Sequence, residues 1–153
     1  MRVSILAIGR ARAAPEAALV SDWLKRFDAA GRPLGLGPAK LVELEDRRGQ
    51  GESRLLEAAI PTGAFVLALD ERGREMTSPD FAALIGAERD NGRRDAAFLI
   101  GGADGHDDAL RARADRLLSF GRMVWPHMLA RAMLAEQLYR ATQILAGAPY
   151  HRA

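Results

Sequence analysis

Short apolar runs alternate along this chain with stretches of helical periodicity. Residues 3–8, 64–69 and 96–100 are almost entirely apolar, as expected for strands that are covered on both faces. A stretch that opens at Pro15 and another that opens at Pro126 carry apolar residues at helical spacing. Strands that alternate with helices predict an α/β domain with a mainly parallel sheet flanked by helices.

Weaker patterns complete the predicted set of elements. Residues 41–45 alternate apolar and polar side chains, which is typical of a strand with one exposed face. A short helix is expected over residues 53–60, another helix starts with Ser78 as its N-cap, and a third covers residues 107–113. Residues 117–120 are predicted to form the last, short strand.

Three of the predicted strands end in a glycine or aspartate turn. Gly9 follows the first strand, Gly101 follows the strand at 96–100, and a tight turn is expected over residues 69–73. Because parallel strands end at the same edge of a sheet, these turns should lie together. Ligands of open α/β sheets bind at that edge, so a functional site is expected there.

The run Ile100-Gly101-Gly102-Ala103-Asp104-Gly105 limits what such a site can bind. Its spacing differs from the dinucleotide fingerprint G-x-G-x-x-G, and Asp104 places a negative charge where a pyrophosphate would sit. The run therefore favours a small ligand that is not a polyanion. Two adjacent glycines cost conformational entropy, so something must approach the backbone closely, either a ligand or a neighbouring helix.

The segment Gly121-Arg122-Met123-Val124-Trp125-Pro126 precedes the last helix without a capping side chain. Since Trp125 stands where Ser, Thr, Asp or Asn is usual, the first N–H groups of the helix have no side-chain acceptor. They can bind polar groups of a ligand, or water. Met123, Val124 and Trp125 would either form an apolar wall for a ligand or belong to the core.

Histidines and the C-terminal tail offer further candidate residues. The histidines do not have metal-ligand spacing, so no metal site is expected. His106 is expected to be exposed in a loop, and His127 to lie in the first turn of the last helix. The tail Tyr150-His151-Arg152 combines a stacking ring, an imidazole and a guanidinium, which suits a nucleotide, unless the end of the chain is frayed.

Composition sets outer limits on the function. Residues 1–153 can bury a proper core as a single domain, and the chain has no cysteine for disulfides, zinc–thiolate sites or thiol catalysis. It shows no apolar run that could span a bilayer and no signal segment, so a cytoplasmic protein with no membrane partner is expected. A P-loop, a nucleophile elbow and a protease-like triad are all missing from the sequence.

Arginine accounts for all but two of the 22 basic residues. A coding bias explains such a total, because alanine and glycine are also abundant. Clusters at predicted strand ends and loops instead favour a basic rim that faces RNA. These clusters are Arg2, Arg10 and Arg12, the pair Arg47-Arg48, Arg72 and Arg74, and Arg111, Arg113 and Arg116.

Several of these segments together form the pattern of a known family. They are the opening strand to Gly9, Leu67-Ala68-Leu69-Asp70-x-x-Gly73, Leu99-Ile100-Gly101-Gly102-x-x-Gly105, Pro126-His127 with Leu129 and Arg131, Ala135-Glu136-Gln137-Leu138-Tyr139-Arg140-Ala141, and Pro149-Tyr150-His151-Arg152. On these residues, over nearly its whole length, the chain resembles the RlmH family, the ribosomal RNA large subunit pseudouridine N3-methyltransferases of the SPOUT superfamily. Residues 102–105 and 122–125 depart from the pattern of that family.

The resemblance implies a C-terminal trefoil knot that binds S-adenosylmethionine, and an obligate homodimer. It implies methylation of N3 of a pseudouridine in 23S rRNA, in the helix 69 loop of the large ribosomal subunit, with no DNA partner. His151 would act as the general base, while Tyr150 and Arg152 would hold the nucleotide. Residues 35–51, with Arg47-Arg48, are candidates to bind the RNA. The implied cofactor contacts are Leu69, Gly101, Gly102, Gly121, Arg122, Met123, Val124, Trp125 and Pro126.

A second hypothesis stays open, in which the same fold serves as a non-catalytic RNA- or ribosome-binding module. The unusual residues 122–125 are the feature that favours it. Calorimetry with S-adenosylmethionine separates the two, because a module without a cofactor pocket gives no heat of binding. A third hypothesis, a nucleotide-binding α/β regulator, is disfavoured by Asp104 and by the missing phosphate loop.

Overall fold

The computed structural model describes the backbone of residues 1–152 and the side chains of residues 1–150. Within these residues five parallel strands form one sheet, in the order β2-β1-β4-β3-β5. The strands are β1 Arg2–Ile8, β2 Ala39–Leu44, β3 Phe65–Arg74, β4 Asp95–Ile100 and β5 Arg116–Leu118. The predicted α/β fold with a mainly parallel sheet is confirmed.

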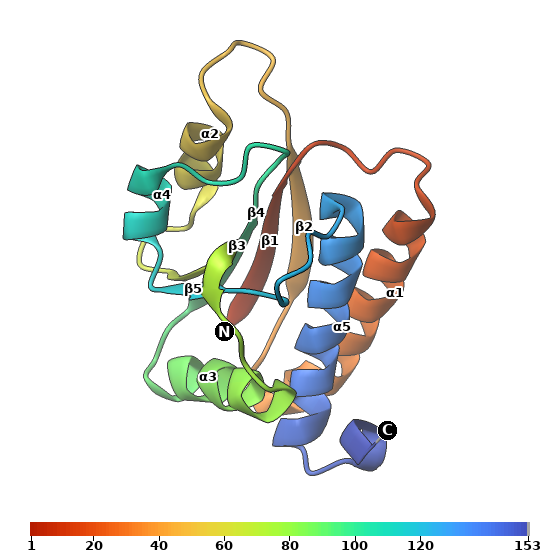
Figure 1. Cartoon of the computed structure of the whole chain (residues 1–153). Helices are drawn as coiled ribbons and strands as arrows, with labels where there is room; N and C mark the ends of the chain where they lie inside the picture. The colour runs from red at the N-terminus through yellow and green to blue at the C-terminus, as the bar shows by residue number, and fades with distance from the viewer. Residues whose placement is uncertain (153) are drawn as a thin grey trace.

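Helices cover both faces of the sheet (Figure 1). The helices on one face are α1 Pro15–Gly31, α3 Ser78–Asp90 and α5 His127–Leu145, and those on the other are α2 Glu52–Ala59 and α4 Asp108–Arg113. Two short 3-10 helices, η1 Arg32–Leu34 and η2 Pro149–Arg152, follow α1 and α5. None of the helices among residues 1–152 is both long enough and apolar enough to cross a membrane. The trefoil knot stays a prediction.

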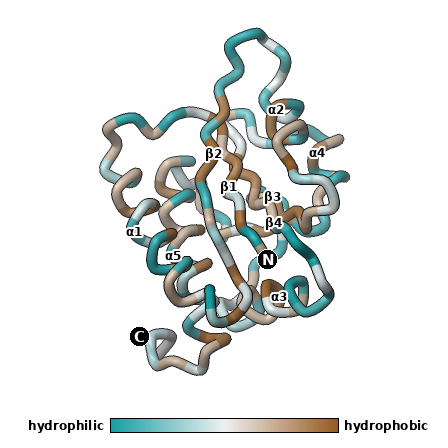
Figure 2. Tube along the Cα trace, turned by 180° about the vertical axis from the view of Figure 1, so that it is seen from behind, coloured by the Kyte–Doolittle hydropathy of each residue, from teal (hydrophilic) through white to brown (hydrophobic). Residues whose placement is uncertain are grey.

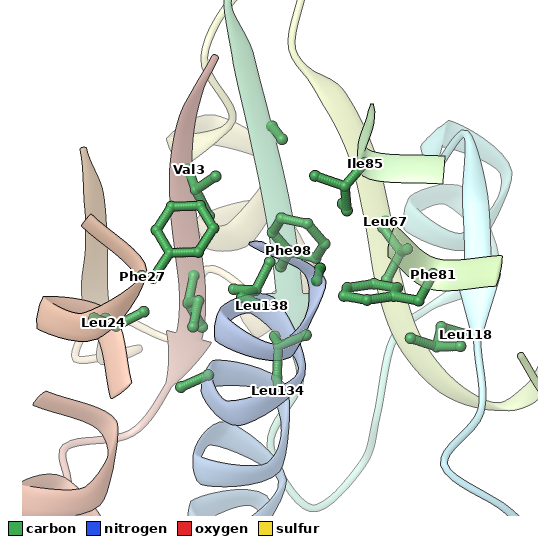
Figure 3. Close-up of a cluster of buried hydrophobic side chains, with 14 of the residues drawn as sticks. Val3, Leu24, Phe27, Leu67, Phe81, Ile85, Phe98, Leu118, Leu134 and Leu138 are labelled. Carbon is green, nitrogen blue, oxygen red and sulfur yellow. The ribbon is translucent and has the colours of Figure 1, made fainter. Parts of the chain in front are cut away.

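The core consists of two apolar layers on opposite faces of the sheet. Successive side chains of β1 alternate between them, so that Val3 packs toward α1 and α5 whereas Leu6 packs toward α2 and α4. Phe27 of α1, Phe98 of β4 and Leu138 of α5 lie in the larger layer (Figure 3). All residues of β4 are buried, as expected for a central strand. Figure 2 shows the strands as mostly hydrophobic and the loops beyond them as mostly hydrophilic.

β3 runs through the turn expected at residues 69–73, so that expectation is wrong. The strand bulges after Leu69 and pairs with Leu118 of β5 again at Arg74. Gly73 permits this close approach, because a Cβ at residue 73 would lie 2.6 Å from the backbone N and C atoms of Leu118. The end of β3 therefore fixes where β5 ends and where the chain turns toward α5.

β5 ends at Leu118, two residues earlier than the predicted strand at 117–120. The Ser119 hydroxyl donates to the carbonyl of Gly121 at 3.0 Å and accepts from its N–H at 3.1 Å. These local bonds compete with strand pairing and turn the chain out of the sheet. The turn starts the segment that leads to α5.

α3 begins one residue earlier than predicted, at Ser78 itself. Thr77, not Ser78, is the N-cap, since its Oγ1 accepts from the N–H of Asp80 at 3.2 Å. Ser78 is instead the first helical residue, and its hydroxyl donates to Oε1 of Gln137 in α5 at 2.7 Å. The prediction of Ser78 as cap is therefore wrong, and the side chain serves to join α3 to α5.

Candidate functional site

A cleft of about 270 Å³ lies at the carboxyl edge of the sheet, which is uppermost in Figure 1. The end of β3, the loop after β4 and the segment between β5 and α5 form its walls, together with His127 and Ala130 of α5. Gly9 borders the same edge, because a Cβ at residue 9 would lie 3.8 Å from Nε2 of His127. The predicted gathering of Gly9, residues 69–72 and Gly101 at one edge is confirmed, although β3 continues beyond residue 69.

The glycine loop after β4 is packed closely against other parts of the protein. A Cβ at Gly102 would lie 2.6 Å from a carboxylate oxygen of Glu52, at the start of α2, and one at Gly101 would lie 3.0 Å from the backbone of Gly105. The glycine pair was expected to allow close approach of either a ligand or a neighbouring helix, and the structure shows the approach of helix α2. The remaining surface of the loop lines the cleft.

The segment before α5 carries an exposed apolar surface beside this loop. Met123 is 74% exposed, Val124 87% and Trp125 38%, so these side chains do not belong to the core. All three line the cleft, and Nε1 of Trp125 donates to the carbonyl of Phe120 at 3.3 Å. The exposed side chains form the predicted apolar wall.

α5 begins without a side-chain cap, as predicted, but it starts at His127, one residue later than expected, so Trp125 is not the N-cap. Pro126 occupies the N-cap position and no side chain within residues 1–150 caps the helix there. The N–H groups of that turn have no intrahelical partner and carry the positive end of the helix dipole. They are available at the edge of the cleft for an oxygen atom of a ligand or for water.

His106 is a buried histidine of the cleft wall. It is 3% exposed, so the expectation of an exposed loop residue is wrong. Arg111 explains the difference, because it donates to the carbonyl of His106 and also lies 3.5 Å from Oδ2 of Asp70, which holds residue 106 against β3. Within the described side chains neither ring nitrogen makes a well-formed hydrogen bond, although the backbone at Leu69 and Leu99 approaches the ring. Burial lowers the pKa of His106, and the charge of Asp70 opposes this effect, so the imidazole is neutral at pH 7.

Most of the predicted cofactor contacts meet in this cleft. Those that line it are Leu69, Gly101, Gly102, Gly121, Met123, Val124 and Trp125. Arg122 and Pro126 belong to the same segment before α5 but do not line the cleft. The cofactor contacts themselves stay a prediction.

The C-terminal tail lies away from the cleft of its own chain (Figure 1). Tyr150 donates to Oε1 of Glu136 at 3.1 Å, packs edge-on against Tyr139 at 4.9 Å, and has the guanidinium of Arg140 over its ring at 5.0 Å. Tyr150 is therefore packed, not frayed. Glu136 is nine residues beyond His127, which is roughly 14 Å along α5. The side chains of His151 and Arg152 lie outside the described residues.

Comparisons with known proteins assign the chain to a family. A family model described as "Predicted SPOUT methyltransferase" matches residues 1–151. The chain is 63% identical to the ribosomal RNA large subunit methyltransferase H of Dinoroseobacter shibae, and 61% and 60% identical to those of Ruegeria pomeroyi and Paracoccus denitrificans. Each match covers 99% of this chain and 99% of the relative. The chain belongs to the SPOUT methyltransferases.

Solved structures share the fold of this chain at low sequence identity. A probable methyltransferase from Bordetella pertussis Tohama I has a TM-score of 0.58 at 16% identity, with 92% of this chain and 94% of that chain covered. A probable methylase family protein from Haemophilus influenzae Rd KW20 has a TM-score of 0.52 at 12% identity, with 97% and 69% covered. Identities this low support the fold alone.

Arg131 is a buried residue of this SPOUT methyltransferase to which the sequence patterns assign no structural role. It is 1% exposed and donates to the carbonyls of Ile8 and Gly9, at 2.5 and 2.8 Å, and to Oε1 of Glu43 at 2.9 Å. It thereby ties the ends of β1 and β2 to α5. One signal for it was present, since Arg131 stands three residues before Leu134 on the apolar stripe of α5.

Proposed function

We propose that this chain is an S-adenosylmethionine-dependent methyltransferase that methylates N3 of a pseudouridine in 23S rRNA, in the helix 69 loop. The full-length identity of about three residues in five to ribosomal RNA large subunit methyltransferases carries this proposal. The cleft at the carboxyl edge supplies a place for the methyl donor, at the position that open α/β sheets use for ligands.

The residues of the cleft fit S-adenosylmethionine. Exposed Met123 and Trp125 offer apolar surface for an adenine ring, and the uncapped turn of α5 offers N–H groups for oxygen atoms. The cleft lining also contains charged residues: Asp70 is paired with Arg111, while Glu71 and Asp104 outnumber the remaining Arg72. This balance suits a ligand that carries positive charge and no phosphate. When bound, the donor supplies an electrophilic methyl group on a sulfonium.

The cofactor would be held by backbone turns on one side and by apolar side chains on the other. The proposed contacts are Leu69, Gly101, Gly102 and the segment of residues 121–126, in which Arg122 and Pro126 would contribute through the backbone. Holding the donor and the nucleotide in line is the main task of such a site, because correct positioning alone can lower a barrier by several kcal/mol.

The tail supplies the proposed catalytic groups. N3 of pseudouridine must lose its proton as it gains a methyl group, and His151 would accept that proton. Tyr150 and Arg152 would hold the nucleobase and the phosphate of the target nucleotide. Since Tyr150 packs against Glu136, far from the cleft of its own chain, we infer that the tail serves the cleft of a second copy. A homodimer follows from this arrangement. The substrate, a ribosome, places the reaction in the cytoplasm.

Isotope transfer to ribosomes tests the proposal. Assembled ribosomes from a strain that lacks this protein are incubated with the purified chain and S-adenosylmethionine with a trideuterated methyl group, then digested and analysed by mass spectrometry. The expected product is one trideuteromethyl group on N3 of a pseudouridine from the helix 69 loop. Heat of cofactor binding without any label in RNA would contradict the proposed catalysis and favour the ribosome-binding module.

A further inference from the structure

Two arginines from two different loops contact one carboxylate, and a third arginine lies nearby. Nη2 of Arg47, in the loop after β2, lies 2.7 Å from Oε2 of Glu45, and Nε of Arg10, in the loop after β1, lies 3.4 Å from the same oxygen. The hydrogen bond from Arg47 lowers the pKa of Glu45, and the charges of Arg10 and Arg12 lower it further. Three guanidinium groups around one carboxylate leave an excess of positive charge.

Other acidic residues fix the backbone of the two loops and do not neutralise these arginines. Glu43 accepts from the N–H of Ala11 at 2.7 Å, and Asp46 accepts from the N–H groups of Gln50 and Gly51 at 2.9 and 2.8 Å. The two loops are also joined directly, because the N–H of Gly9 donates to the carbonyl of Leu44 at 2.8 Å. The arginine side chains therefore extend from two loops whose backbones are held by hydrogen bonds.

Two of the arginines, Arg12 and Arg48, have no acidic partner within residues 1–150 in contact with the guanidinium. Arg12 has a φ of +45°, and among residues 1–152 it is the one non-glycine residue with positive φ. Strain of this kind is concentrated at functional sites. Arg48 is exposed, and within the described side chains its guanidinium makes neither an ion pair nor a hydrogen bond. Both charges face solvent without a partner carboxylate in contact.

These arginines follow the ends of β1 and β2, at the edge of the sheet that also carries the cleft. Arg10 and Arg12 line a hollow of about 530 Å³ at the same edge of the sheet. Gly9, which precedes them, is next to His127, and His127 lines the cleft. The loop after β2 projects beyond the sheet at this edge and is hydrophilic along most of its length (Figure 2). A large polyanion bound at the cleft is long enough to reach these arginines along the same edge.

We propose that Arg10, Arg12, Arg47 and Arg48, here called the arginine rim, bind phosphate groups of the RNA backbone next to the target nucleotide. This inference rests on the proposed function, because it names the surface by which that substrate is held. A guanidinium matches two phosphate oxygens with its planar pair of N–H donors, which suits this role better than lysine. Glu45 orients Arg10 and Arg47 while Arg12 and Arg48 remain unpaired.

A charge-matched pair of variants tests the arginine rim. The rim variant Arg12→Ala/Arg48→Ala is compared with Arg32→Ala/Arg94→Ala, which removes the same charge from two exposed arginines that precede β2 and β4, at the opposite edge of the sheet. Binding to assembled ribosomes is measured between about 0.05 and 0.3 M KCl, roughly the range in which phosphate contacts respond to salt. Affinity for S-adenosylmethionine and the thermal melting curve report whether each variant is folded.

The rim variant should lose two phosphate contacts. Each contact contributes about 0.7 to 0.9 to the slope of log K against log salt, so the slope should become shallower by about 1.4 to 1.8. At 0.1 M salt this corresponds to binding that is about 25- to 60-fold weaker, whereas the control and the cofactor affinity should stay near wild type.

The outcomes separate the two proposals. Equal ribosome binding and equal salt slopes in the rim and control variants, while the wild type methylates RNA, would overturn the arginine rim. Absence of methyl transfer by the wild type would instead contradict the proposed function.

Discussion

Replacing Arg131 with methionine should lower the free energy of unfolding of the protein. The substitution Arg131→Met keeps the length and apolar stem of the side chain but removes every donor from a position that is 1% exposed. The carbonyls of Ile8 and Gly9 then lose their donor, and Glu43 loses a cation at 2.9 Å.

The size of the effect follows from these three acceptors. A buried carbonyl without a donor costs about 1–3 kcal/mol, and Glu43, whose side chain is 26% exposed, regains part of its hydration. Breaking one side of a buried pair typically costs about 3–5 kcal/mol, and we expect a loss in this range. A protein of this size has about 5–15 kcal/mol of stability in total, so the variant should still fold.

Urea unfolding followed by tryptophan fluorescence measures this loss. The control Arg94→Met changes an exposed arginine and should alter the free energy of unfolding by less than about 0.5 kcal/mol. The double variant Arg131→Met/Glu43→Gln should recover part of the loss, because the unpaired carboxylate is removed. A decrease below about 1 kcal/mol for Arg131→Met would refute the role given to Arg131.

Three further changes test other parts of the structure. Gly73→Ala should destabilise by about 3 kcal/mol or more in urea, because its Cβ would lie 2.6 Å from backbone atoms of Leu118, and a change under 1 kcal/mol would contradict the observed β3–β5 contact. Trp125→Ala should weaken S-adenosylmethionine binding in calorimetry about tenfold, or about 1.4 kcal/mol, through loss of apolar surface, and unchanged affinity would remove Trp125 from the cofactor wall. The folded-state pKa of His106 lies below its unfolded value, so the protein takes up a proton when it unfolds below about pH 6.5. The free energy of unfolding should therefore decrease as the pH is lowered below about 6.5, by at most about 1.4 kcal/mol per pH unit. His106→Leu should remove this part of the pH dependence of urea unfolding, and an unchanged profile would place the titration elsewhere.

The sequence was sufficient for the pattern of elements and for the edge of the sheet that carries the cleft. Short runs that are continuously apolar, or that alternate apolar and polar residues, predict strands from local sequence alone. The carboxyl ends of parallel strands necessarily lie at the same edge of the sheet. The extension of β3 could not be predicted, because the need for Gly73 arises only from the backbone of β5, which is distant in sequence. The burial of His106 depends in the same way on Arg111 and Asp70.

The candidate site was predicted in its composition but not in its full arrangement. Local patterns indicated the glycine loop, the uncapped start of α5 and the apolar wall, and all of these lie around one cleft. Local patterns do not show that Tyr150 packs against Glu136 at a distance from that cleft, since this depends on how the chain folds back after α5. Arg131 was overlooked as a structural residue because a single arginine in an apolar stripe is a weak signal.

The most direct test of the account is a crystal structure with S-adenosylhomocysteine, the form of the cofactor that remains after methyl transfer. The account predicts this molecule between the loop after β4 and the segment of residues 121–126, with its adenine against Trp125. Density in the hollow of about 510 Å³ beside Phe81 and Glu136, or an empty cleft at saturating ligand, would contradict it.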